Sequence, residues 1–248
     1  MNKRARDLIA DLNNQAVECL SGNDLRQAVH HMNKAMALTK RVLNHNDEEL
    51  ALNESSTSYQ SQVTDDCPRV SKSTSRRISL IPCSKSGNQE KAILSVSRAE
   101  PFMYELPIVI STEANETNPN FFDEAAAIIT FNLALTQHRN ALKRDGEDRT
   151  MRLEKALKLY ELCNALRIKE KVSWDYSITM GLFNNIGLIT RELGDIEKSR
   201  RYFDRMLSAI VMFQVKQVEP SCDGVVWESF IQNAASSVLT DHHFAAAA

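Results

Sequence analysis

Glycine and proline are scarce in this chain, and their scarcity narrows the fold class. Only seven glycines and six prolines occur among 248 residues. A protein built from many short strands needs more of both, because tight turns require them at particular positions. The periodic stretches are instead rich in Ala, Leu, Lys, Arg and Glu, which are strong helix formers. The composition therefore predicts an all-α fold.

Paired cysteines and long apolar runs are also missing. The five cysteines are scattered and form no CxxC pair, which argues against both a disulfide framework and a zinc site. They are Cys19, Cys67, Cys83, Cys163 and Cys222. A reducing compartment fits this pattern, so we expect a cytoplasmic protein, with the nucleus as the alternative. No stretch approaches the ~20 apolar residues that cross a bilayer, so we expect no membrane span.

Charge of one sign and catalytic motifs are lacking as well. The net charge is -2, and no basic stripe is visible, so nucleic acid is not an expected partner. No GxGxxG, GxxxxGK[ST], HExxH or GxSxG motif is present, which removes the common phosphate, zinc and nucleophile sites. We therefore predict a non-enzymatic protein without cofactor or metal. A helical enzyme of unrecognised type is the last-ranked alternative.

The most regular stretch present is Phe183 to Leu207, FNNIGLITRELGDIEKSRRYFDRML. Its apolar and small residues recur at helical spacing on both sides of Gly194-Asp195. Gly194 can adopt the left-handed conformation that ends a helix, and Asp195 can cap the next helix. The stretch therefore predicts two helices joined by a tight turn.

Two other parts of the chain share this register. Residues 6–43 and the stretch from Phe121 onward each repeat an asparagine, a small residue two positions later, and a large residue on the partner helix. The repeated triplets begin at Asn14, Asn132 and Asn185. In the copy from Phe121, with Asp123 as the expected N-cap, an insertion around 143–150 predicts either a longer hairpin or an exposed loop. A final helix is expected over VVWESFIQNAASSVL, covering the last repeat.

These helix pairs resemble the tetratricopeptide repeat family. The resemblance implies a solenoid of about three helix pairs plus a terminal helix, with the first pair in residues 1–45, the others in 121–240 and a frayed tail at 241–248. It also implies a concave groove, lined by the first helix of each pair, that binds a peptide or a helix of another protein. Carried over by position, the groove residues are Asn13, Val17, Phe131, Leu135, His138, Arg139, Asn184, Leu188, Arg191 and Glu192.

Residues 46–120 interrupt the pattern. They are rich in serine and poor in apolar periodicity, so we predict a disordered linker. FMYELPIVI, within 101–110, is the exception, and it could be a short strand or an extended segment that docks on a helical groove. Pro107 would interrupt a central strand, so docking is the better interpretation.

Two functional hypotheses follow from these features. The first is a protein-interaction scaffold whose groove holds a partner; neither the partner's identity nor the oligomeric state can be predicted. The second is a regulatory adaptor whose linker occupies its own groove until it is displaced. Ser79, in Arg76-Arg77-Ile78-Ser79, is a candidate phosphorylation site for such a switch, because basophilic kinases read arginines upstream of the acceptor.

Overall fold

The computed structural model of the chain describes residues 2–56, 101–111, 118–169, 176–216 and 224–245. These residues form α-helices and no strand, which confirms the all-α prediction. In chain order the helices are α1 (Asn2–Ser21), α2 (Leu25–Ser56), α3 (Phe121–Ala141), α4 (Gly146–Lys169), α5 (Tyr176–Glu192), α6 (Ile196–Lys216) and α7 (Gly224–Ala245).

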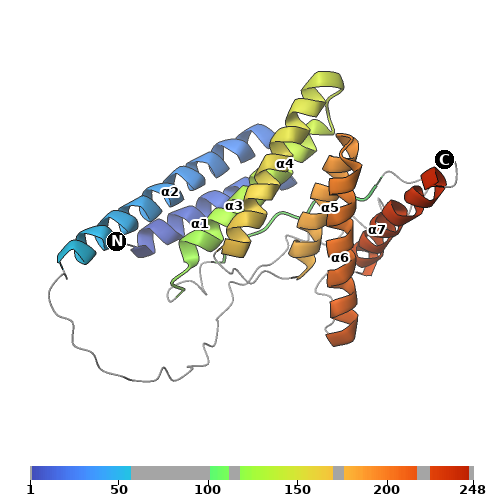
Figure 1. Ribbon diagram of the computed structural model, residues 1–248. Helices are drawn as coiled ribbons and strands as arrows, with labels where there is room; N and C mark the ends of the chain where they lie inside the picture. The colour runs from blue at the N-terminus through green and yellow to red at the C-terminus, as the bar shows by residue number, and fades with distance from the viewer. Residues whose placement is uncertain (1, 57–100, 112–117, 170–175, 217–223, 246–248) are drawn as a thin grey trace, which may run out of the picture.

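The first six helices form three hairpins, α1/α2, α3/α4 and α5/α6 (Figure 1). Each helix packs on its neighbour in the chain, and in addition α1 packs on α3 and α5 packs on α7. The unpaired helix α7 lies against α5 and α6. The odd-numbered helices therefore approach one another as two groups, α1 with α3 and α5 with α7.

The turns of two hairpins have the expected chemistry. Gly194 has a φ of +86°, and the side chain of Asp195 accepts a 3.0 Å hydrogen bond from the backbone N–H of Lys198. In the α1/α2 turn, Asn23 takes the left-handed conformation with a φ of +65°, and Asp24 accepts a 3.1 Å bond from Gln27 N–H. Each turn thus ends one helix and caps the next.

The insertion in the second hairpin lengthens its helices. Only residues 142–145 separate α3 from α4, so the longer hairpin, and not an exposed loop, is formed. The expected N-cap is wrong, because α3 begins at Phe121 and Asn120 occupies the cap position without a side-chain bond. Asp123 lies in the first turn instead, where its negative charge complements the helix dipole.

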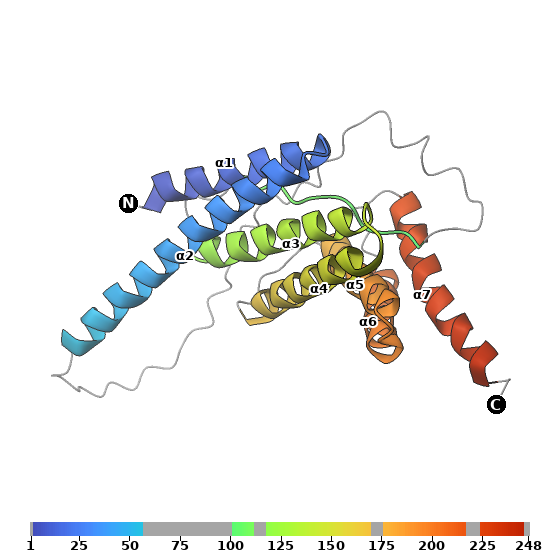
Figure 2. The ribbon, with the colours of Figure 1, turned by 90° about the horizontal axis from the view of Figure 1, so that it is seen from above.

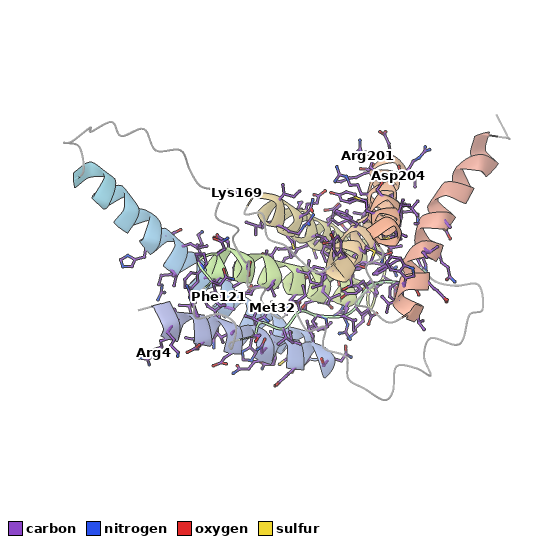
Figure 3. All side chains as sticks on the ribbon, turned by 90° about the horizontal axis from the view of Figure 1, so that it is seen from below. Arg4, Met32, Phe121, Lys169, Arg201 and Asp204 are labelled. Atoms are coloured by element: carbon purple, nitrogen blue, oxygen red, sulfur yellow. The ribbon has the colours of Figure 1, made fainter. Side chains whose placement is uncertain are left out.

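Small residues on the first helix of each pair allow close packing. Ala16, Ala134 and Gly187 are in the core, with the first two fully buried. A Cβ atom added to Gly187 would lie only 2.9 Å from the ring of Phe203, so this contact requires glycine. Figure 3 shows side chains filling the interior around Met32 and Phe121, whereas Arg4 and Arg201 lie at the outside.

Several boundaries differ from those expected. Helix α2 continues to Ser56, beyond residue 45, and α7 continues to Ala245, into the stretch expected to fray. The predictions for Ser79 and for the serine-rich residues 57–100 lie outside the described residues. Among the described helices, none is both long enough and apolar enough to cross a membrane.

Candidate functional site

Residues 101–111 form an extended strap, here called the bridging segment, that belongs to no helix. It runs between α1 and α7 past the other odd-numbered helices, as the green trace in Figures 1 and 2 shows. Its neighbours in space are far away in sequence: Ile110 bonds to Asn14, and Phe102 bonds to Asn233. The interpretation of FMYELPIVI as an extended segment docked on helices agrees with this arrangement.

Four asparagine side chains hold the backbone of the bridging segment. Each donates its Nδ2 to the carbonyl of one segment residue and accepts that residue's N–H at Oδ1, with distances of 2.7–3.2 Å. The pairs are Asn233 with Phe102, Asn185 with Tyr104, Asn132 with Ile108 and Asn14 with Ile110. A carboxamide carries a donor and an acceptor side by side, so it matches the N–H and C=O of one extended residue.

The asparagines form two triads with the same bonding. Within the α1/α3 clamp (Asn13, Asn14 and Asn132), Asn132 donates to Asn13 at 2.9 Å, and Asn13 donates to Asn14 and to the Ile108 carbonyl. Within the α5/α7 clamp (Asn184, Asn185 and Asn233), Asn233, Asn184 and the Phe102 carbonyl repeat these contacts. The clamps therefore satisfy the polar groups that this buried backbone would otherwise leave unpaired.

Aromatic rings surround the segment at the α5/α7 clamp. Tyr104 is only 1% exposed; it stacks on Phe230 with ring centroids 5.8 Å apart and meets Phe131 edge-on at 6.3 Å. Its ring lies directly against α5, where a Cβ added to Gly181 would be 2.5 Å from it. Phe102 contacts the same Phe230 ring at 5.7 Å. The pocket for Tyr104 therefore has a bare helix backbone as one wall.

Aliphatic residues occupy the α1/α3 clamp. Ile108 and Ile110 are 1% and 0% exposed and belong to the hydrophobic core, together with Ile9 and Leu20 of α1. The two ends of the segment therefore share their backbone bonding and differ in their side chains.

Three buried titratable groups lie on α3 and α4, and one of them bonds to an asparagine that holds the segment. Asn185 donates a 3.0 Å bond to the Tyr160 hydroxyl oxygen, and burial raises the pKa of Tyr160, so this group stays protonated. Burial, together with the positive charge of Arg149, lowers the pKa of the neighbouring His138 to about 3. Burial also raises the pKa of the Cys163 thiol, which donates to the Ala127 carbonyl at 3.4 Å. All three groups are neutral near pH 7, which is what an apolar interior favours.

Three of the ten groove residues expected from the family resemblance contact the bridging segment. Asn13 and Asn184 donate to the carbonyls of Ile108 and Phe102 at 3.0 and 2.8 Å, and Phe131 meets the Tyr104 ring. A further three are buried apolar residues of the helix interior, namely Val17, Leu135 and Leu188. The segment therefore lies over the middle of the odd-numbered helices.

The remaining four expected residues serve contacts between helices near the C-terminal ends of α3 and α5. His138 is buried against Tyr160, and Arg139 donates to the Leu20 carbonyl at 3.0 Å, near the end of α1. Arg191 lies over the Phe203 ring, and Glu192 pairs with Arg149. None of these four contacts involves the bridging segment.

Sequence reasoning missed the four asparagines that bracket the segment, that is, bond both the N–H and the C=O of one segment residue. The sequence nevertheless carries a signal for them. Asn14, Asn132 and Asn185 mark the repeat register, and the same Asn-x-small triplet recurs at Asn233 in α7. A polar side chain repeated on the buried face of successive helices needs a hydrogen-bond partner there. The triplets could therefore have indicated a backbone ligand as well as a register.

Metal binding gains no support from the described part of the chain, where no group of His, Cys, Asp or Glu residues could hold an ion. The chain matches no family model, and comparison with curated proteins and with solved structures found no match.

Proposed function

We propose that this chain is a protein-interaction module that binds an extended peptide across α1, α3, α5 and α7. In the self-occupied state the bridging segment fills that site, and a partner's peptide replaces it. The observation that carries the proposal is the set of four asparagine brackets, each an Nδ2 donor and an Oδ1 acceptor on one residue, at two pairs of alternate segment residues and at 2.7–3.2 Å. The proposal joins the scaffold hypothesis to that of an adaptor regulated by its own linker.

The brackets bond main-chain atoms, which any extended peptide can supply. A helical ligand cannot supply them, because its N–H and C=O groups are already paired within the helix. Such a site therefore favours an extended ligand over a helical one. Extended peptides bound through main-chain hydrogen bonds, with pockets for alternate side chains, are a common mode of protein recognition.

A non-enzymatic role is part of the same proposal. The described groups with the most perturbed pKa values, His138, Tyr160 and Cys163, are buried in the helix interior with at most 3% exposure. Their pKa values move toward the neutral form because of burial, as happens to any core residue. A catalytic group would need access to a substrate, and these three have none.

The test supplies the peptide from outside. In a segment-replaced chain, residues 101–111 are exchanged for a Gly/Ser sequence of equal length, and a fluorescein-labelled peptide of residues 101–111 is titrated by fluorescence polarisation. We expect saturable binding, with weaker binding to the wild-type chain, whose site is occupied. N-methylation at the Tyr104 position should abolish binding, because that N–H is bracketed, whereas N-methylation at the exposed Glu105 position is the matched control.

The replaced chain has lost a buried strap, so its fold is checked by circular dichroism. If helicity is reduced, the parent peptide should restore it, and the N-methyl-Tyr104 peptide should not. A full chain carrying only Tyr104→Ala provides a second, less disruptive receptor. Absence of binding to both folded receptors would contradict the proposed function and make the segment a fixed part of the fold.

A further inference from the structure

The side chains of the bridging segment define which peptides this site can take, an inference that rests on the proposed function. We infer that the partner peptide carries two bulky apolar residues two positions apart, the second of them aromatic. A second pair, two β-branched aliphatic residues with the same separation, lies six positions after the corresponding residues of the first pair. In the chain's own segment these positions are Phe102, Tyr104, Ile108 and Ile110.

The aromatic requirement comes from Gly181. The Tyr104 ring lies where a Cβ on Gly181 would meet three ring atoms at 2.5–2.9 Å, so the pocket fits a flat ring against bare backbone. Phe230 and Phe131 form two further walls, with ring centroids 5.8 and 6.3 Å away. An aliphatic side chain would leave part of this slot empty and lose the ring contacts.

The aliphatic requirement comes from the α1/α3 clamp. Ile108 and Ile110 are 1% and 0% exposed, and their backbone N–H groups donate to Asn132 of α3 and Asn14 of α1. A charged residue at either position would be desolvated without a partner. β-Branched residues also favour the extended conformation that the brackets require.

The spacing of six residues comes from the equivalence of the two clamps. Asn132 and Asn14 hold Ile108 and Ile110 just as Asn233 and Asn185 hold Phe102 and Tyr104. Side chains of an extended chain alternate between two sides, so an odd change in spacing turns one pair away from the helices. Removing two residues leaves both pairs facing the helices but shortens the extended peptide by roughly 6.6 Å, so it can fill only one clamp at a time.

Proline is excluded from the four bracketed positions, because each donates its N–H to an asparagine. Pro107 falls between the two pairs, where no asparagine accepts a segment N–H. Met103 is also buried in the core, so the position between Phe102 and Tyr104 must be apolar as well. The inferred pattern is therefore bulky apolar, apolar, aromatic, three residues of which the last is buried, aliphatic, any, aliphatic, with proline allowed only between bracketed residues.

The experiment uses the segment-replaced chain and labelled peptides of residues 101–111. One peptide has alanine at the Tyr104 position, one lacks the Leu106-Pro107 pair, and a length control has Ala-Ala in its place. We expect at least about tenfold weaker binding for the first two, since an aromatic or a whole clamp is worth that much. The length control loses the apolar contacts of Leu106 and Pro107 but can fill both clamps, so it should bind more weakly than the parent peptide and more tightly than the shortened peptide.

A receptor variant separates pocket shape from general damage. In the Gly181→Ala background the new methyl fills the slot, so the alanine peptide should bind at least as tightly as the parent peptide, reversing the wild-type order. Gly224→Ala is the matched control, because a Cβ there meets nothing within 4 Å.

The outcomes distinguish the two proposals. Equal binding of parent, alanine and shortened peptides would overturn the inferred pattern and leave the proposed function standing. An unchanged order in Gly181→Ala would also overturn it. Absence of binding by the parent peptide itself contradicts the proposed function.

Discussion

The α1/α3 clamp and the α5/α7 clamp hold the same strap with the same seven hydrogen bonds, yet they bury different side chains. At one end the buried residues Ile108 and Ile110 are aliphatic, and at the other Phe102 and Tyr104 lie in an aromatic cluster. Asn13, Asn14 and Asn132 correspond to Asn184, Asn185 and Asn233 in their contacts with the segment backbone. The backbone conformation of the segment and the burial of its side chains therefore have separate physical sources.

The same comparison shows how α7 is attached. Phe230 of α7 contacts the rings of Phe102 and Tyr104, and Asn233 bonds to Phe102 and to Asn184 of α5. Helix α1 packs on α2 and α3, and α7 likewise packs on α5 and α6. In both clamps the helices therefore contact each other directly as well as through the segment.

The largest expected effect comes from Phe230→Ala, which removes the ring between Phe102 and Tyr104. Loss of a fully buried aromatic side chain should lower the free energy of unfolding by about 3–5 kcal/mol. Hydrogen exchange should show faster exchange at the Tyr104 amide than at the Ile108 amide, because only the α5/α7 clamp loses a wall. Urea unfolding gives the total change.

Val225→Ala, on the same helix at a residue 38% exposed, is the control and should change stability by less than about 1 kcal/mol. Equal acceleration at both segment amides in Phe230→Ala would show that the two clamps open as one unit.

The next effect is a comparison of Asn185→Ala with Asn132→Ala. Each removes the acceptor of a segment N–H and a donor to the same residue's C=O, while the Ile108 carbonyl keeps its bond from Asn13, and we expect each to cost about 2–4 kcal/mol. Asn185→Ala should cost more, because it also removes the bond to the buried Tyr160 hydroxyl. Urea unfolding of both variants measures the difference, and a smaller loss for Asn185→Ala would contradict the shared bonding scheme.

Acid should act through His138, which is buried against Tyr160. Burial and Arg149 lower the folded-state pKa to about 3, whereas the unfolded pKa is near 6.5, so the unfolded state binds the proton first. Stability contributed by the neutral imidazole is full above pH 6.5 and falls as the pH drops toward 3. We expect a loss on the order of 2 kcal/mol between pH 6.5 and 5.

His138→Gln should flatten this part of the pH dependence, measured as unfolding free energy against pH. His30→Gln, at an exposed position, is the matched control and should leave the slope unchanged. An unaltered slope in His138→Gln would assign the acid sensitivity to other groups.

The smallest effect is expected from Arg149→Ala, which breaks the ion pair with Glu192 between α4 and α5. Both side chains are about one-third exposed, so solvent screening limits the pair to less than about 1 kcal/mol. Thermal unfolding at low and high salt measures it. A loss comparable to that of the asparagine variants would mean that contacts at the helix ends, and not the asparagine clamps, hold the helices in place.

Much of the fold follows from local patterns. Gly194 and Asp195 form their turn and cap because both functions need only neighbouring backbone. The close approach of Gly187 and Phe203 follows from helical periodicity. Helix boundaries were less accurate, since α2 and α7 continue past the expected ends. The family resemblance itself stays a prediction.

The sequence indicated several residues of the candidate site and an extended segment, but not that these residues bind that segment. The family resemblance placed Asn13 and Asn184 in the groove, and Pro107 favoured an extended, docked segment. Asn14, Asn132 and Asn185 indicated only the register of the repeats. The resemblance also placed Arg139, Arg191 and Glu192 in the groove by position, and the structure shows these residues in contacts between helices. A single repeat gives no information on which side chains share a ligand.

The sequence by itself determined the helices, their tight turns and the recurrence of Asn-x-small triplets, because these depend on periodicity and on residues within a few positions of one another. Only the tertiary structure decided that asparagines separated by up to 219 positions, from Asn14 to Asn233, bracket one strap in order. The hydrogen bonds between these asparagines and the segment depend on how the hairpins pack on one another. Such packing brings together residues too far apart in the chain for a local sequence pattern to reveal their contact.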